Sequence, residues 1–272
     1  MLGRAEAMTR FDHDTTITPL GEGRFRARLD RGWWILRGPN GGYLAAILMR
    51  AIEAEIGDPG RSPRSLTIHF LAPANEGPVD VEVRTERRGN SLTSVQVRMA
   101  QEGRLIAIGL AVLGQARPAF EIPDAQMPEV LPPEQLERNQ RDIPISGRFD
   151  VRMLPGHQPF SGSQHGSVAG WIRLDEPQLL DYILLAAYTD SFPPALFSML
   201  DDSAPIGMPT VDLTIHFHAA LPRPQDKADD YCLARISTQT SHQGFVGEDA
   251  EIWSRDGQLL ARARQLAAVV RD

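Results

Sequence analysis

The chain has 272 residues, of which 42% are hydrophobic and 23% charged, a composition typical of a globular protein that excludes a disordered or fibrous chain. With 28 Lys and Arg against 35 Asp and Glu, its net charge is −7, which argues against a general nucleic-acid-binding protein, because such proteins gain affinity by neutralising phosphates. The single cysteine, Cys232, excludes an intrachain disulfide and a cysteine-based metal cluster, and we interpret it as a small core residue.

The sequence carries no sign of export or membrane insertion. The first residues lack the apolar core of a signal peptide. The longest apolar stretches, such as residues 179–187, fall short of the roughly 20 residues that a membrane span needs. We therefore expect a cytoplasmic protein without a membrane span, in a reducing compartment.

The first half of the chain predicts one helix among several strands. Residues 24–29 form a strand-like run, and a helix is expected to open at Pro39–Gly42 and to stop near Gly57. This helix is apolar around most of its circumference, so we expect it to be buried on nearly every side. Three further strand-like runs follow, at residues 79–85, 95–99 and 104–113.

The second half predicts the same order of elements. A strand at residues 167–174 precedes a helix from about Pro177 to Asp190, which Pro193 and Pro194 end or kink. Strands are then expected at residues 231–238, 245–253 and 259–270, with a hairpin turn at Asp256–Gly257. Residues 117–144 contain six prolines and predict an extended linker between the halves.

The two halves also share sequence. Ser-Leu-Thr-Ile-His-Phe-Leu-Ala at residues 65–72 reappears as Asp-Leu-Thr-Ile-His-Phe-His-Ala at residues 212–219, an offset of 147 positions. A second echo follows in the same order, Glu-Gly-Arg-Leu-Ile-Ala at residues 102–107 and Asp-Gly-Gln-Leu-Leu-Ala at residues 256–261. Such a long period indicates two copies of a domain, because solenoid repeats are roughly 20–50 residues long.

Each copy therefore reads as a helix wrapped by an antiparallel sheet, which is the hotdog arrangement. Two copies predict an α+β double hotdog, in which the sheets join edge to edge and hide their exposed strand edges. The predicted boundaries are residues 11–116 for the N-terminal hotdog, 117–147 for the Pro-rich linker and 148–272 for the C-terminal hotdog.

Three polar residues of the second copy are candidates for chemistry. Asp190 falls late in an apolar helix, where a carboxylate is costly unless it is hydrogen-bonded or functional, and a local helix cap is an equally open interpretation. Thr210 precedes the strand at residues 211–217, and Gln265 lies in the last strand. By themselves, the latter two read as polar residues of a sheet.

Together these features resemble the acyl-CoA thioesterase II family, over residues 11–270. The resemblance rests on an aspartate late in the helix, on Thr-Val-Asp opening the Leu-Thr-Ile-His-Phe-His strand, and on a glutamine in the final strand. It implies that Asp190, Thr210 and Gln265 together hold the water that hydrolyses an acyl-CoA thioester, without metal, cofactor or covalent intermediate. A buried carboxylate suits this role because burial raises its pKa toward neutral pH.

The start of the first helix is a candidate for the oxyanion site. Free N–H groups at a helix N-terminus can stabilise a developing negative charge, and Gly41 and Gly42 would let a substrate approach the backbone closely. An ordinary strand-to-helix turn explains the same two glycines.

The first copy lacks the candidate groups. The repeat offset places Pro63 at the position of Thr210, and alignment of the two Gly turns places Ala111 at the position of Gln265. The matching helix turn near Met49 has no aspartate. We therefore expect one active site per chain.

Other interpretations remain open at this stage. The same fold supports hydration of acyl thioesters, although no Asp/His dyad is apparent, and a non-catalytic acyl- or CoA-binding protein can retain it. His216 and His218 share a strand face without a third ligand, so no metal site is expected. Four large aromatic residues either line an acyl tunnel or fill the core: Trp33, Trp34, Tyr43 and Phe192. We also expect a homo-oligomer, a dimer or higher.

Overall fold

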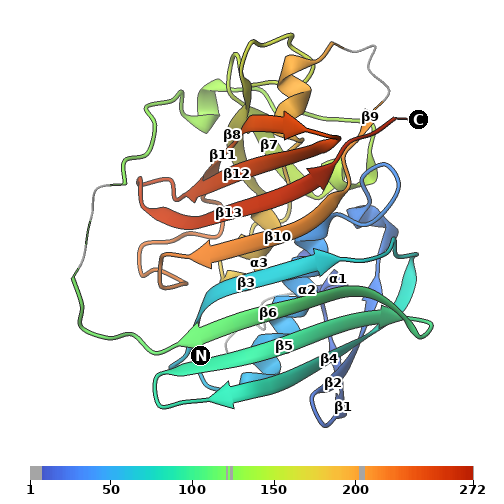
Figure 1. Ribbon diagram of the computed structural model, residues 1–272. Coiled ribbons are helices and arrows are strands. Elements are labelled where there is room, and N and C mark those ends of the chain that lie inside the picture. Colours follow the sequence, from blue (N-terminus) through green and yellow to red (C-terminus); the bar gives the residue numbers. More distant parts are fainter. Residues whose placement is uncertain (1–7, 121, 123–124, 202–205, 272) are drawn as a thin grey trace.

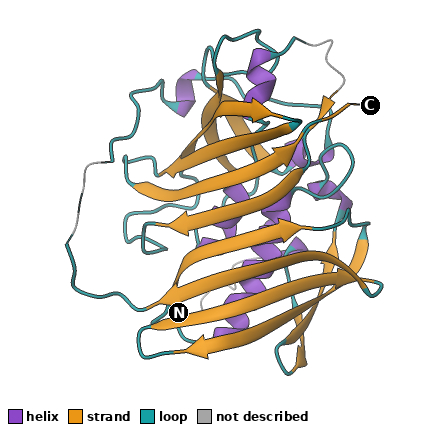
Figure 2. Ribbon diagram, viewed as in Figure 1, coloured by secondary structure: helices purple, strands orange, loops and turns teal. Residues whose placement is uncertain are grey.

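The computed structural model describes residues 8–120, 122, 125–201 and 206–271. Twelve strands form one antiparallel sheet, and the two central helices lie behind it in the view of Figures 1 and 2. One side of this sheet comes from the first half of the chain and the other side from the second half. The structure thus confirms the predicted α+β double hotdog.

The first half contains one long helix, α2, at Gly41–Ile56. Its start and end follow the predicted signals, because Asn40 caps it and Gly57, with φ of 57°, ends it in the left-handed conformation. A short helix, α1, spans Arg10–Asp14. The strands of this half are β1 (Thr18–Gly21), β2 (Arg24–Leu29), β3 (Ser62–Phe70), β4 (Gly77–Arg88), β5 (Leu92–Gln101) and β6 (Arg104–Gly114).

The second half repeats this order around α3, at Tyr182–Tyr188. Its strands in the large sheet are β7 (Phe149–Met153), β8 (Gly166–Leu174), β10 (Thr210–Phe217), β11 (Cys232–His242), β12 (Phe245–Trp253) and β13 (Leu259–Ala268). Two short strands, β9 (Ile206–Gly207) and β14 (Val270–Arg271), pair separately. Short 3₁₀ turns occur at Arg31–Trp33, Pro133–Gln135, Pro144–Gly147 and Ala195–Met199.

The helix α3 is shorter than the sequence predicts. It begins only at Tyr182, because Asp181 is extended and its side chain accepts the N–H of Leu184 at 2.7 Å as an N-cap. It ends at Tyr188, so the expectation that Asp190 lies inside the helix is wrong. Asp190 instead occupies the turn that follows.

The two halves meet at the repeated sequence. Strands β3 and β10 pair antiparallel at the middle of the sheet, with Thr67 opposite Thr214 and their hydroxyl oxygens 3.1 Å apart. These two threonines are equivalent in the repeat, so a pseudo-twofold axis passes between them. The order of strands on either side of this seam obeys the same symmetry. The duplication therefore joins the two sheets edge to edge, as predicted.

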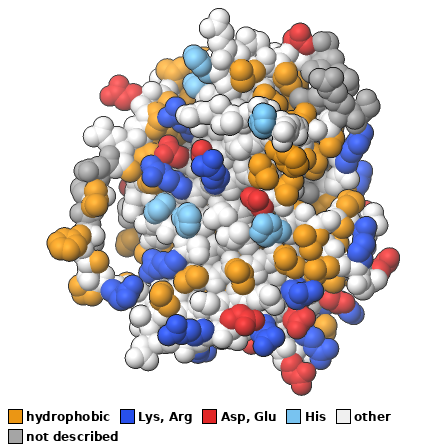
Figure 3. Space-filling model, viewed as in Figure 1, with side chains coloured by type: hydrophobic (Ala, Val, Ile, Leu, Met, Phe, Trp, Pro, Cys, Tyr) orange, Lys and Arg blue, Asp and Glu red, His pale blue; other side chains and the backbone are white. Residues whose placement is uncertain are grey.

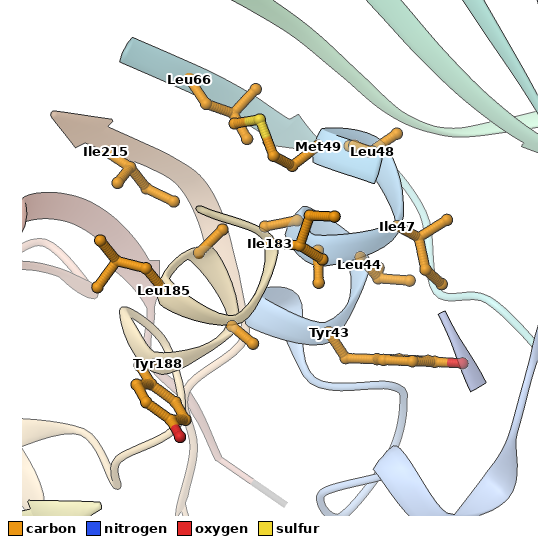
Figure 4. Packing of buried hydrophobic residues seen from close by; sticks show 14 of the residues in the cluster. Tyr43, Leu44, Ile47, Leu48, Met49, Leu66, Ile183, Leu185, Tyr188 and Ile215 are labelled. Atoms are coloured by element: carbon orange, nitrogen blue, oxygen red, sulfur yellow. The ribbon is translucent and has the colours of Figure 1, made fainter. Parts of the chain in front are cut away.

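The core lies where α2 and α3 pack against each other and against the seam strands. Figure 4 shows Leu66 of β3 and Ile215 of β10 beside the side chains of the two helices. Trp33, Trp34 and Tyr43 are no more than 2% exposed, which favours the core interpretation of these aromatic residues.

Two further side chains follow the same pattern. Phe192 packs against the core and is partly buried. Cys232 is buried, and burial raises the pKa of its thiol to about 12, so it is a core residue as expected.

The second part of the Pro-rich segment between the halves packs against the rest of the protein. Met127, Val130 and Leu136 pack on a buried cluster that includes Trp171 and Trp253, from the second-repeat side of the large sheet. The indole N–H of Trp171 donates to the main-chain oxygen of Leu131 at 2.8 Å.

The exposed face of the sheet mixes charged, histidine and apolar side chains, as Figure 3 shows from the side opposite the helices. Among the described residues, no helix has the length and apolar character needed to cross a membrane.

Candidate active site

Asp190 lies at the contact between the two repeats, against the N-terminus of α2. Its carboxylate oxygen Oδ2 accepts the main-chain N–H of Gly42 at 3.1 Å. The side-chain amide of Asn40, the N-cap of α2, donates to the main-chain oxygen of Asp190 at 2.6 Å. An acid of the second repeat therefore caps a helix of the first, where the positive end of the helix dipole favours a negative charge.

The two glycines at the start of α2 make this close contact possible. A Cβ atom on Gly41 would lie 2.6 Å from Oδ2 of Asp190, and one on Gly42 would lie 2.4 Å from the main-chain oxygen of Ala187. Both distances are shorter than any normal carbon–oxygen contact. The Gly42 N–H already donates to Asp190, so it is not the free oxyanion donor that we expected from the sequence.

The surroundings of Asp190 raise the pKa of its carboxyl group into the neutral range. Burial raises its pKa from 3.8 to about 7. The N–H groups of Gly42 and Gly41 oppose this shift, and the negative charge of Glu248 adds to it. The carboxylate can therefore take up a proton at neutral pH, as a general base must.

Thr210 reaches the inner face of the sheet through a β-bulge. Between Thr210 and Asp212 the pairing of β10 with β13 shifts by one residue, so that Thr210 lies opposite Ala267. The extra residue of a bulge shifts the alternation of side chains, so the residues beyond it face the opposite side from the one that a regular strand would give them. It thereby places Thr210 on the same face as Gln265, and the Thr210 hydroxyl donates to Oε1 of Gln265 at 3.3 Å.

Gln265 in turn is held by Glu248, which is not among the predicted site residues. The Nε2 of Gln265 donates to Oε2 of Glu248, on the neighbouring strand β12, at 2.7 Å. The structure thus brings Thr210 and Gln265 into direct contact. In the described structure, Asp190 has no direct hydrogen bond to either of them. The link between Asp190 and the pair is electrostatic, because the negative charge of Glu248 raises the pKa of Asp190.

Glu248 and Asn40 are not among the predicted site residues, but both leave a signal in the sequence. Val246, Ala250 and Ile252 alternate along β12 on the buried face, and Glu248 falls in the same register, as the only charged residue of that row. Asn40 immediately precedes the two glycines at the predicted helix start, and Asn is a preferred N-cap residue.

The equivalent positions of the first repeat are apolar. The pairing of β3 with β6 carries the same bulge, between Pro63 and Ser65, which places Pro63 at the position of Thr210. Ala111 of β6 lies opposite Val95 of β5, as Gln265 lies opposite Glu248. Counted from the N-caps Asn40 and Asp181, the position of Asp190 is taken by Met49. The counterparts are all buried: Met49, Pro63, Val95 and Ala111.

Comparison with known proteins places the chain in a family. The profile of the acyl-CoA thioesterase C-terminal domain matches residues 125–269, more than half of the chain, and that of the acyl-CoA thioesterase N-terminal domain matches residues 30–114. The chain belongs to the acyl-CoA thioesterase family. The resemblance seen in the sequence is thereby confirmed for both repeats of this thioesterase-family chain.

Solved structures agree over the whole length. A conserved hot dog protein of unknown function from Alicyclobacillus acidocaldarius is 29% identical, with a TM-score of 0.86 over 98% of this chain and 100% of that chain. A candidate thioesterase II from Thermobifida fusca is 30% identical, with a TM-score of 0.83 over 97% and 98% of the two chains. The acyl-CoA thioesterase II TesB2 of Mycobacterium marinum, 20% identical, shares the fold, with a TM-score of 0.78 over 96% and 98%.

Proposed function

We propose that this protein hydrolyses acyl-CoA thioesters to a free acid and CoA, at one site per chain formed by Asp190, Thr210 and Gln265. The observation that carries the proposal is the asymmetry of the repeats. The site in the second repeat holds a carboxylic acid, a hydroxyl and an amide. The equivalent positions of the first repeat hold only apolar groups. Polar groups are costly to bury, so their presence in one repeat alone favours a chemical role.

In the proposed reaction, Thr210 and Gln265 orient a water molecule beside Asp190. Asp190 removes a proton from this water as the water oxygen bonds to the thioester carbonyl carbon. When the carbon–sulfur bond breaks, Asp190 returns the proton to the departing CoA sulfur. The products are the carboxylic acid and CoA, and no bond forms between the protein and the acyl group.

The N-terminus of α2 contributes to this reaction through its dipole. In the resting state its positive end faces the carboxylate of Asp190. Once Asp190 has accepted the proton of the water, the negative charge resides on the oxygen of the tetrahedral intermediate. The same helix end then stabilises that oxyanion, so the charge moves within one favourable field.

Release of CoA from a panel of acyl-CoA substrates tests the proposed function. The purified chain is mixed with aliphatic and aromatic acyl-CoAs and a thiol-reactive dye. We expect free thiol to appear with at least one of them. Binding of an acyl-CoA without release of CoA would instead favour a non-catalytic acyl- or CoA-binding protein.

The pH dependence of hydrolysis follows from the raised pKa of Asp190. The base must be ionised, so we expect kcat/KM to rise about tenfold per pH unit at low pH and to level off above about 7. A carboxyl with the ordinary pKa of 3.8 would give a flat profile throughout the neutral range. Initial rates measured from two pH units below to two units above neutrality distinguish the two profiles.

A further inference from the structure

Glu248 is a buried carboxylate inside the second repeat. It is 1% exposed, and it faces the interior from β12 together with Val246 and Ile252. Burial raises its pKa, while three hydrogen bonds favour its ionised form. They come from the main-chain N–H of Ala195 at 2.6 Å, that of Leu196 at 3.4 Å and the side chain of Gln265 at 2.7 Å.

This carboxylate decides which way the amide of Gln265 points. Both oxygens of Glu248 accept hydrogen bonds here, Oε1 from two main-chain N–H groups and Oε2 from Nε2 of Gln265, so the NH₂ group of Gln265 faces this side chain. The amide oxygen is then turned toward Thr210, whose hydroxyl donates to it. Without an acceptor at position 248, the oxygen and the NH₂ group of Gln265 would be free to exchange places.

We propose that Glu248 is a positioning residue, which holds the side-chain amide of Gln265 with its oxygen toward Thr210 and the attacking water. This inference rests on the proposed hydrolytic function. A water that gives one proton to Asp190 has a second proton, and the Gln265 oxygen can accept a hydrogen bond from it. The same carboxylate holds the N–H groups of Ala195 and Leu196, in the segment that follows Asp190.

The variant Glu248→Gln is expected to reverse the amide of Gln265. The oxygen of the new amide is required by the N–H of Ala195, so its NH₂ group faces Gln265. Two NH₂ groups cannot bond to each other, and Gln265 turns its own NH₂ group toward Thr210 and the water. We expect kcat to fall about ten- to a hundredfold, the effect of one unsatisfied polar group, with KM little changed.

Exchange of the two residues is expected to restore activity. In Glu248→Gln/Gln265→Glu, the amide at position 248 donates to the carboxylate at position 265, whose other oxygen faces Thr210. The contact from position 248 to Ala195 is the same in the single and the double variant. If Glu248 acts only by anchoring that segment, the second substitution therefore cannot rescue the first.

Glu251→Gln is the matched control. Glu251 lies on the same strand but on the opposite face, where it pairs with Arg262 at 2.9 Å. The same chemical change there is expected to leave kcat unchanged.

The experiment compares kcat, KM and thermal melts of the wild type and the three variants, with the acyl-CoA that the wild type hydrolyses fastest. We expect a lowered kcat in the single variant and recovery of at least half of the loss, on a logarithmic scale, in the double variant. An unchanged kcat in Glu248→Gln, or a folded double variant no faster than the single one, overturns the positioning role alone. A wild type that releases no CoA overturns the proposed function, and the role with it.

A folding failure also has a defined meaning. If only Glu248→Gln fails to fold, the folded double variant decides by its kcat relative to the wild type: a rate within tenfold supports the role, and a lower one overturns it. If neither variant folds, Glu248 serves the fold, and the proposal is overturned.

Discussion

Asp190→Asn is expected to lower acyl-CoA hydrolysis by about a hundred- to ten-thousandfold, the usual cost of losing a general base. The amide oxygen of the asparagine can still accept the N–H of Gly42, so the contact between the repeats persists, but the side chain can no longer take a proton from water. The first repeat has Met49 in the equivalent place and cannot compensate. Steady-state release of CoA by the variant measures the loss.

The stability of this variant separates a catalytic from a structural role. The folded state raises the pKa of Asp190 from 3.8 to about 7, so it binds the proton more tightly than the unfolded chain does. The resulting stabilisation is complete below pH 3.8 and is lost as the pH rises through about 7. Above that pH, Asp190→Asn is expected to melt no lower than the wild type. A collapsed melting temperature together with lost activity would favour a structural role.

Asp181→Asn provides the matched control for this prediction. Asp181 is also an aspartate at an end of α3, and burial raises its pKa as well, but it caps the start of this helix, whereas Asp190 follows its end. Asparagine is as good an N-cap as aspartate, so this variant is expected to keep the wild-type rate. Activity near half of the wild type in Asp190→Asn would mean that the first repeat carries a working site.

Gly42→Ala is expected to destabilise the protein by about 1–3 kcal/mol or more, because the added carbon overpacks the contact between α2 and α3. Its Cβ would lie 2.4 Å from the main-chain oxygen of Ala187, which cannot move as a flexible side chain could. The better helix propensity of alanine, about 1 kcal/mol, offsets only part of this cost. The two helices must separate, and Asp190 moves with the end of α3. We expect a lower melting temperature and a lower rate.

Gly38→Ala is the control for this substitution. A Cβ atom on Gly38 would have no neighbour within 4 Å, so the variant is expected to melt like the wild type. Equal melting temperatures for Gly42→Ala and Gly38→Ala would contradict the close packing of the two helices.

The duplicated fold could be predicted because it depends on patterns along the chain. The equivalence of Leu66 with Leu213, read from two short matches, places Thr67 beside Thr214 at the centre of the sheet. The start of α3 differs from the predicted one because the apolar run extends back to Leu179, whereas Asp181 caps the helix only from Tyr182 onward. A cap depends on backbone angles that the apolar pattern does not determine.

The site could be predicted only in part. The residue types Asp190, Thr210 and Gln265 could be chosen by resemblance, but not the β-bulge that turns Thr210 to the inner face. The contact of Asp190 with Gly42 joins residues 148 positions apart, and no local pattern reports such a contact. Glu248 is a charged residue in a row of alternating buried residues of β12, which is a signal in the sequence. Its partner, Gln265, can be identified only from the strand pairing.

The most direct test of the proposed mechanism is a single turnover in water labelled with ¹⁸O, with the protein in excess over an acyl-CoA substrate. The released acid and the peptide that contains Asp190 are both analysed by mass spectrometry. Direct attack by water predicts one ¹⁸O atom in the acid and an unlabelled Asp190 peptide. An unlabelled acid with ¹⁸O on Asp190, or an acyl group attached to that peptide, would contradict it.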